Sequence, residues 1–232
     1  MPPSGKKGLT IAIDGPAAAG KSTVARAVAA RLGLTYVDTG AMYRALTLKA
    51  LESGVDPQDG PALGRLARGT SIELGPSRGS GGQRVRLDGR DVTREIRSRE
   101  VDRAVSHVSR HPEVREWLSR VQERMAEDAV VMEGRDIGTV VLPHADLKVY
   151  LDASFDRRVE RRYRELEAKG YSPDLGAVRE DMAQRDRLDS TREAAPLAAA
   201  EDAVRIDTTD MTLEEVVEEV LRLAGRSAGS RG

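Results

Sequence analysis

The chain has 232 residues, with 37 lysines and arginines against 38 aspartates and glutamates, and no cysteine. This length suffices for one large α/β domain, and the net charge of −1 excludes a whole-chain attraction to nucleic acid or to an anionic membrane. The lack of cysteine excludes disulfides, thiolate metal sites and a cysteine nucleophile, and it fits the reducing cytoplasm, where we expect the protein to reside.

Short apolar runs alternate with helical patterns along most of the chain. The first run stops at Asp14, which is far too short for a membrane-spanning helix, so we expect no membrane association. The helical patterns after the first two runs stop at Gly33 and Gly54. Strands are predicted at residues 9–13, 34–38, 129–134, 147–153 and 203–207. Five buried strands separated by helices predict an α/β fold with a five-stranded parallel sheet flanked by helices.

Residues 71–96 differ from this pattern, because apolar and polar residues alternate there between glycine-rich turns. Such alternation predicts a small antiparallel β-sheet, which we place in an insert of about residues 59–98. A tail of residues 226–232 is expected to be disordered. Residues 8–225, the insert included, are interpreted as a single unit whose core is formed by residues 8–58 and 99–225.

A bare loop joins the first strand to the first helix. The phosphate-loop pattern G-x-x-x-x-G-K-[ST] is matched by Gly15, Pro16, Ala17, Ala18, Ala19, Gly20, Lys21 and Ser22. Small side chains let backbone N–H groups surround phosphate oxygens, and the helix N-terminus adds its positive dipole end. We expect Lys21 at the β- and γ-phosphates of ATP, Ser22 at Mg²⁺ and Thr23 near the α-phosphate. The alternative, a glycine-rich turn with a solvated lysine, is disfavoured by the strand and helix on either side.

Phosphate loops occur in switch GTPases, motor ATPases and kinases of small molecules. The chain has no asparagine, so the N-K-x-D motif of GTPases is absent, and no D-x-x-G follows the loop. The apolar run that ends at Glu133 lacks the second acid usual in AAA-type motors. A kinase for a small acceptor is the class that remains.

Six of the 37 basic residues are lysine, which leaves 31 arginines, and most arginines of any protein are solvated. Three clusters stand out by position: residues 39–44, 134–136 and 185–192. The first two follow predicted strands, and ligands of open parallel sheets bind at the carboxyl ends of strands. Guanidinium groups there can neutralise and orient two anions in contact, such as ATP and a nucleoside monophosphate. A monophosphate acceptor is already anionic, so no general base is required.

Seven blocks occur in unbroken order along the chain: IDGPAAAGKSTVA, VDTGAMYRALT, DGRDVTREIRSREVD, HPEVREWL, MEGRDIGTVVLPHADLKVYLDAS, RVERRYREL and QRDRLDSTREAAPL. From about residue 9 to about residue 223 the sequence resembles the bacterial cytidylate kinases, nucleoside monophosphate kinases of pyrimidine metabolism that make CDP from CMP and ATP. The GRDIGTVV and RDRLDSTRxxAPL blocks are not shared with adenylate or shikimate kinases, which have the same core. The family also has a small sheet inserted in its monophosphate-binding region, in agreement with the insert predicted from alternation.

The resemblance implies the ligands of CMP. Its phosphate is expected at Thr39, Arg44, Arg135 and Arg192, and its sugar at Arg185 and Asp189, whose spacing of four puts them on one helical face. The cytosine edge is expected at Ser106, Arg115 and Asp136. The alternatives are a surface serine at 106, an ion pair of Arg115 with Glu113 or Glu116, and a helix cap at Asp136.

The stretch SFDRRVERRYRE, residues 154–165, begins with a serine that can cap a helix and is dense in arginine. In the resemblance it belongs to a short lid, about residues 154–170, whose Arg158, Arg161 and Arg162 fold over ATP and act with Lys21 and Arg135 in catalysis. Closure of a lid excludes water that would otherwise accept the phosphoryl group. A solvated helix with partners such as Glu160 and Glu165 is the alternative. Glu133 is expected either near Mg²⁺, beyond its direct ligands, or in a structural role.

The reaction expected from the resemblance is ATP + (d)CMP = ADP + (d)CDP, with Mg²⁺ as cofactor, no nucleic-acid partner and a monomeric enzyme. Two alternatives stay open: a nucleotide-binding module whose turnover is incidental, and a kinase for another small acceptor. The spacing of His107, His111 and His144 supports no metal site.

Overall fold

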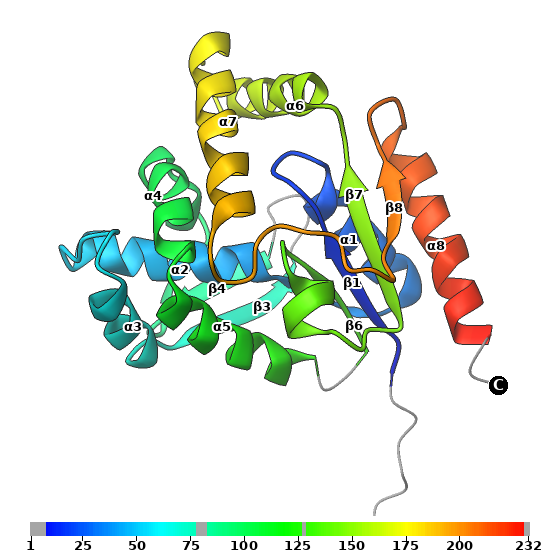
Figure 1. The fold of residues 1–232 in the computed structure, drawn as a ribbon, viewed down its shortest axis with the longest axis horizontal. Coiled ribbons are helices and arrows are strands. Elements are labelled where there is room, and N and C mark those ends of the chain that lie inside the picture. The colour runs from blue at the N-terminus through cyan, green and yellow to red at the C-terminus, as the bar shows by residue number, and fades with distance from the viewer. Residues whose placement is uncertain (1–7, 78–82, 127–128, 230–232) are drawn as a thin grey trace, which may run out of the picture.

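The structure is a computed structural model that describes residues 8–77, 83–126 and 129–229. Its larger sheet has five parallel strands in the order β2-β6-β1-β7-β8 (Figure 1). These strands are β1 (Thr10–Asp14), β2 (Thr35–Asp38), β6 (Val130–Glu133), β7 (Leu147–Asp152) and β8 (Val204–Asp207). The prediction of a five-stranded parallel sheet is confirmed, because the five apolar runs are the five strands.

Helices cover both faces of this sheet. On one face, α1 (Lys21–Leu32) and α8 (Leu213–Gly229) pack apolar residues such as Val28 and Val220 against β1 and β7. On the other face, a π-helical turn, η3 (Ile137–Val141), packs on β1, β2 and β6. As predicted, α1 stops at Gly33, whose φ of 66° favours glycine.

The expectation of a disordered tail from residue 226 is wrong for its first part. Helix α8 continues to Gly229, and the Ser227 hydroxyl donates to the Leu223 carbonyl within it. Ala224, one turn earlier, is anchored in the core, so the helix extends past the last apolar contact. Residues 230–232 lie outside the described ranges.

The insert forms a second sheet, antiparallel, in the order β3-β4-β5. Its strands are β3 (Ile72–Ser77), β4 (Gln83–Leu87) and β5 (Arg90–Asp91), followed by a 3₁₀ turn, η2 (Glu95–Arg97). The predicted small antiparallel sheet is confirmed, although the expected turn at 78–82 falls outside the described residues. Val85 and Leu87 pack against α2 (Thr39–Glu52). The side chain of Gln83 bonds the backbone of Tyr36 and Asp38, which ties the insert to β2.

Three more helices surround α2 in a separate apolar cluster: α3 (Gly60–Arg68), α4 (Arg99–Ser109) and α5 (Pro112–Met125). Helices α6 (Phe155–Ala168) and α7 (Leu175–Thr191) lie beyond the ends of the strands, with α7 descending between α4 and the large sheet (Figure 1). A small core of Val159, Leu166, Val178 and Met182 holds these two helices together. Within the described ranges, every helix is too short or too polar to span a membrane.

Candidate functional site

A cleft of about 970 Å³ lies at the carboxyl ends of the strands, where α1, α2, α4, α6 and α7 converge. A second, smaller hollow adjoins it and shares Gly40, Arg44, Arg135 and Arg185 with it. Of the residues singled out from the sequence, the large cleft is lined by Ala17, Ala18, Gly20, Lys21, Ser22, Thr23, Arg44, Ser106, Glu133, Arg135, Arg162 and Arg185. The hollow is lined by Thr39, Arg44, Arg115, Arg135, Asp136, Arg185, Asp189 and Arg192. Six segments of the chain thus meet at one place: residues 17–23, 39–44, 106–115, 133–136, 162 and 185–192.

The phosphate loop connects β1 to α1 through a backbone conformation and close packing that only glycine tolerates at Gly15. Gly15 has a φ of 145°, and a Cβ there would lie 2.0 Å from the carbonyl oxygen of Leu151, so only glycine fits. Gly20 caps α1 with a φ of 94° and has no side chain to satisfy the N–H groups of the first turn. These donors and the positive end of the helix dipole are available to an anion.

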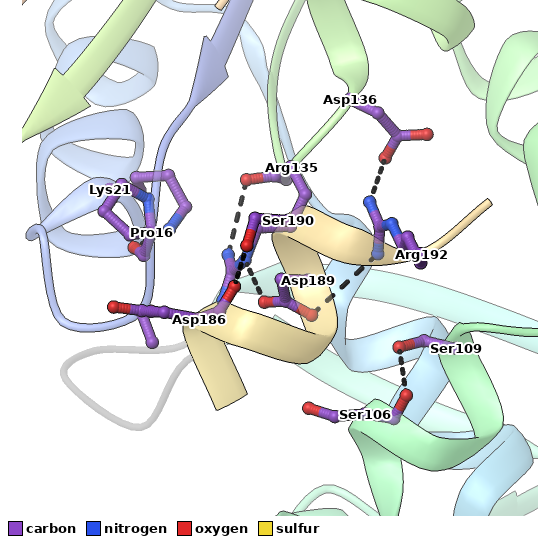
Figure 2. A network of polar contacts seen from close by, with 12 residues as sticks. Pro16, Lys21, Ser106, Ser109, Arg135, Asp136, Asp186, Asp189, Ser190 and Arg192 are labelled. Atoms are coloured by element: carbon purple, nitrogen blue, oxygen red, sulfur yellow. Dashed lines mark hydrogen bonds and ion pairs between the residues drawn. The ribbon is translucent and has the colours of Figure 1, made fainter. Parts of the chain in front are cut away.

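Lys21, at the start of α1, is buried, with 5 % of its surface exposed. Its ammonium donates to the Pro16 carbonyl at 2.7 Å (Figure 2). Burial, followed by repulsion from Arg135, lowers the pKa of Lys21 to about 7. An anionic ligand in the cleft would favour the charged form of this lysine.

Glu133, the last residue of β6, is a buried carboxylate near the first turn of α1. It accepts a hydrogen bond from the Tyr36 hydroxyl at 3.0 Å. Burial and the nearby Asp38 raise the pKa of Glu133, while its hydrogen bond with Ser22 opposes that rise. Ser22 and Glu133 therefore place a hydroxyl and a carboxylate side by side, and oxygen donors of this kind suit Mg²⁺.

Two arginines and two carboxylates interlock beside the smaller hollow (Figure 2). Arg135 Nε donates to Asp189 at 2.9 Å, and Arg192 lies 3.9 Å from Asp189 and 3.8 Å from Asp136. Burial alone would raise the pKa of Asp189, but Arg135 and Arg185 hold it below its usual range. These side chains come from the segment after β6 and from the end of α7, more than 50 residues apart in the chain.

Arg115 pairs with Asp136, and neither alternative raised for these two residues occurs. An Nη2 of Arg115 donates to Asp136 at 2.5 Å, and both side chains are about 95 % buried, with 5 % and 6 % exposed. The Asp136 side chain makes no capping bond to η3. Arg115 also donates to the Ser109 carbonyl at 3.0 Å, one turn from the buried Ser106. Of the three residues expected at the cytosine edge, Arg115 and Asp136 thus line the smaller hollow together, whereas Ser106 lines the large cleft.

Arg44 and the lid arginine Arg162 share a partner that the sequence analysis did not single out, Asp102 of α4. An Nη2 of Arg44 lies 2.6 Å from Asp102, and an Nη2 of Arg162 donates to it at 2.5 Å. Although burial raises the pKa of Asp102, these arginines lower it to about 2. One carboxylate thus joins α2 to the lid helix across the cleft.

The three lid arginines are placed differently. Only Arg162 lines the cleft. Arg158 is buried and donates to Asp186 at 2.7 Å and to the Ala17 carbonyl of the phosphate loop at 3.4 Å. Arg161 donates to the hydroxyl and carbonyl of Thr208, at 3.0 and 2.6 Å. The predicted serine cap is confirmed, since the Ser154 hydroxyl accepts from the Arg157 amide.

Several buried polar atoms that the structure describes in this region have no hydrogen-bond partner, among them one carboxylate oxygen each of Asp102 and Asp186. Among the described residues, the Nε atom of Arg185 and an Nη2 atom of Arg192 are buried without a hydrogen-bond partner. Burial lowers the pKa of Arg185 to about 10. Buried N–H groups without a hydrogen-bond partner are rare in proteins, because each costs free energy unless a ligand satisfies it. The arrangement is suited to binding a polyanion.

Sequence reasoning missed Asp14, Asp102 and Asp186, which bond other groups of the site. Each lies in one of the seven blocks quoted above, but nothing local distinguishes it from the other acidic residues, 38 in all, as a partner of the site's arginines or amides. His107 lies in the wall of the large cleft, where its ring contacts the side-chain amide of Gln58, and His111 bonds the Pro57 carbonyl. The described part of the chain contains no group of three side chains suited to hold a metal by themselves.

Comparisons with known proteins agree with one another. The family model described as cytidylate kinase matches residues 11–226. A cytidylate kinase of Geobacillus kaustophilus (strain HTA426) is 54 % identical over 225 residues, which cover 97 % of this chain and 100 % of that protein. One of Pelotomaculum thermopropionicum is also 54 % identical, over 95 % of this chain and 97 % of that protein. A crystal structure of a gluconokinase from Sinorhizobium meliloti 1021 has a TM-score of 0.50 at 16 % identity and covers 97 % of both chains, which supports the fold alone.

Proposed function

This chain belongs to the cytidylate kinase family, and we propose that the cleft described above is where it transfers the γ-phosphoryl group of ATP to CMP or dCMP. The products are ADP and CDP or dCDP. The phosphate loop and lid bind ATP, and the hollow beside Arg192 binds the monophosphate. The observation that carries this assignment is the convergence of Arg44, Arg135 and Arg185 on the wall shared by the two cavities.

On the ATP side, the backbone N–H groups of residues 15–20 surround the β- and γ-phosphates, and Lys21 contacts both. The low pKa of Lys21 supports this role, since a lysine that is buried beside Arg135 gains from a polyphosphate. Thr23 lies at the α-phosphate. Arg158, which already touches the Ala17 carbonyl, and Arg161 stabilise the closed lid around ATP.

Magnesium is the cofactor we propose, with Ser22 as its protein ligand and Glu133 holding a water of its shell. The donor set fits, because Mg²⁺ in kinases takes few protein oxygens and completes its coordination with water and phosphate. When bound, it neutralises charge that develops between the β- and γ-phosphates. The chain's own part is to place a hydroxyl and a buried carboxylate at the first turn of α1.

On the acceptor side, Thr39, Arg44, Arg135 and Arg192 orient the phosphate of CMP. Its oxygen attacks the γ-phosphorus, the bond to the ADP oxygen breaks, and no proton has to leave the attacking anion. Arg135 lies on the shared wall, so it can contact both phosphates as charge moves between them. Arg162, on the lid side of the cleft, also contacts both phosphates once its ion pair with Asp102 is broken.

The remaining residues select the nucleoside. Arg185 and Asp189, on one face of α7, bind the sugar hydroxyls, while Ser106, Arg115 and Asp136 bind the polar edge of cytosine. A base that leaves the buried Arg115–Asp136 pair unsatisfied is rejected, because unpaired buried polar groups are costly. The insert, about residues 59–98, and the lid, about 154–170, are proposed to close on the two substrates of a monomeric, cytoplasmic enzyme.

The test is release of ADP by purified protein with ATP, Mg²⁺ and each of CMP, dCMP, UMP, AMP and shikimate. We expect turnover with CMP and dCMP well above that with AMP, and none with shikimate. Turnover with AMP but not CMP would contradict the base assignment. Binding of ATP without turnover of any acceptor would favour a nucleotide-binding module instead.

A further inference from the structure

Asp14 is a buried carboxylate for which the mechanism above has no use. It ends β1, directly before the first glycine of the phosphate loop, and only 4 % of its surface is exposed. Its two oxygens accept hydrogen bonds from two successive backbone amides, Ile137 at 2.8 Å and Gly138 at 2.7 Å. A buried carboxylate is costly unless it is well satisfied, so this pairing calls for an explanation.

The two amides belong to the start of η3, immediately after Arg135 and Asp136. On the other side of these two residues, the Gly134 amide donates to the Ile13 carbonyl at 3.0 Å. The segment that carries Arg135 and Asp136 is therefore fastened before and after by neighbouring residues of β1. The same strand end leads directly into the phosphate loop.

The packing leaves little freedom at this contact. A Cβ on Gly138 would lie 3.3 Å from Asp14 Oδ2 and 3.2 Å from Lys148 Cδ, so the amide approaches the carboxylate closely because residue 138 has no side chain. Burial raises the pKa of Asp14 to about 6, while the two amide bonds and the distant Lys21 oppose the rise and Asp136 adds to it. At neutral pH the group is mostly the double acceptor that two N–H donors require.

We propose that Asp14 is a positioning residue that holds Arg135 and Asp136 in register with the phosphate loop, so that the acceptor site is set by the strand that carries the donor site. This inference rests on the proposed roles of Arg135 and Asp136 in binding CMP. A displacement of about 1 Å in a group that positions a substrate can lower the rate about 100-fold. Asp14 thus acts on CMP without touching it.

The principal variant is Asp14→Asn, which keeps the shape but aims an N–H₂ group at one of the two amides. We expect kcat/KM for CMP to fall about 100-fold, while the Kd for ATP measured without CMP stays within about twofold. The matched control is Asp146→Asn. The Asp146 carboxylate lies against the opposite end of β1 and likewise accepts two hydrogen bonds, from the Thr10 amide at 2.8 Å and from the Thr10 hydroxyl at 2.9 Å. That variant should lower Tm without changing either substrate's KM.

A second readout does not depend on activity. Hydrogen exchange at the amides of residues 134–142 should accelerate in Asp14→Asn and remain unchanged in Asp146→Asn. If the wild type fails to phosphorylate CMP, the proposed function falls, whereas unchanged exchange in Asp14→Asn overturns the inference about Asp14.

Gly138→Ala supplies an independent variant that retains the carboxylate and crowds it by a few tenths of an ångström. It should lower kcat/KM for CMP, as Asp14→Asn does, but by a smaller factor. Equal losses in ATP binding and CMP use, in both Asp14→Asn and Gly138→Ala, would reduce Asp14 to a general stabiliser of the fold and contradict the proposal.

Discussion

On the monophosphate side of the cleft, Arg115, Arg135 and Arg192 share two buried carboxylates, whereas on the lid side Arg158, Arg161 and Arg162 of α6 each bond a different neighbour. The carboxylates of the first group, Asp136 and Asp189, are themselves proposed CMP ligands. The partners of the second group are Asp186, Thr208 and Asp102, to which we assign no substrate.

The difference indicates two ways in which the arginines are held in position. In the proposed complex with CMP, the arginines of the first group keep Asp136 and Asp189 as partners, so their geometry exists beforehand and little ordering is needed on binding. Arg162 is held by the carboxylate of Asp102, and in the proposed closure of the lid it would exchange this carboxylate for a phosphate. Variants on the two sides should therefore change different kinetic constants.

The largest effect is expected for Arg192→Met. The proposed contacts of this buried guanidinium with the CMP phosphate are worth about 1.5–3 kcal/mol for each charged hydrogen bond, so their loss should lower kcat/KM for CMP about 1000-fold. Binding of ATP should persist, because Arg192 lines only the smaller hollow. Steady-state kinetics and ATP titration measure the two effects. Arg187→Met, an exposed site on the same helix, is the control, and equal loss of both substrates would refute the role given to Arg192.

Next in size is Arg162→Met on the lid. We expect kcat to fall about 100-fold with a small change in KM for CMP, because a lid arginine acts on charge in the transition state more than on the bound acceptor. The control is Arg164→Met, whose exposed side chain pairs with Glu160 on the outside of the same helix. A rise in KM for CMP at unchanged kcat would place Arg162 with the first group and remove the distinction.

The smallest effect, and the one of opposite sign, is expected for Asp102→Asn. Without this carboxylate, Arg44 is free for the phosphate of CMP, so the Kd for CMP measured by calorimetry without ATP should fall about fivefold. Glu100→Gln, exposed on the same helix, serves as the control. Weaker CMP binding in Asp102→Asn would mean that Asp102 orders Arg44 for the substrate and does not compete with it.

The same variant has a pH signature in stability. The pKa of Asp102 is about 2 in the folded protein and 3.8 in the unfolded chain. The ion pairs of Asp102 therefore stabilise the fold fully above pH 4, and this contribution is lost as the pH falls towards 2. The wild type should exceed Asp102→Asn in free energy of unfolding by about 2 kcal/mol at pH 7. Denaturant unfolding between pH 7 and pH 3 should show this difference shrinking; a difference that is constant with pH would exclude the ion pairs as its cause.

Local signals in the sequence were sufficient for the phosphate loop, the five parallel strands and the antiparallel insert. Each depends on residues close together in the chain: eight consecutive positions for the loop, apolar runs for buried strands, and alternation for a sheet with one solvated face. The roles of the arginines required a resemblance to a known family, because 31 arginines offer no local pattern that separates a ligand from a solvated residue.

Only the tertiary structure decided how the charges are paired. It joins Arg115 to Asp136 and not to Glu113 or Glu116, turns Arg161 to Thr208, and brings Asp14 to the amides of η3. These partners are 21, 47 and 124 residues apart. A carboxylate in the sequence looks the same whether it faces water or a buried amide, since its partner is chosen by how the strands and helices pack.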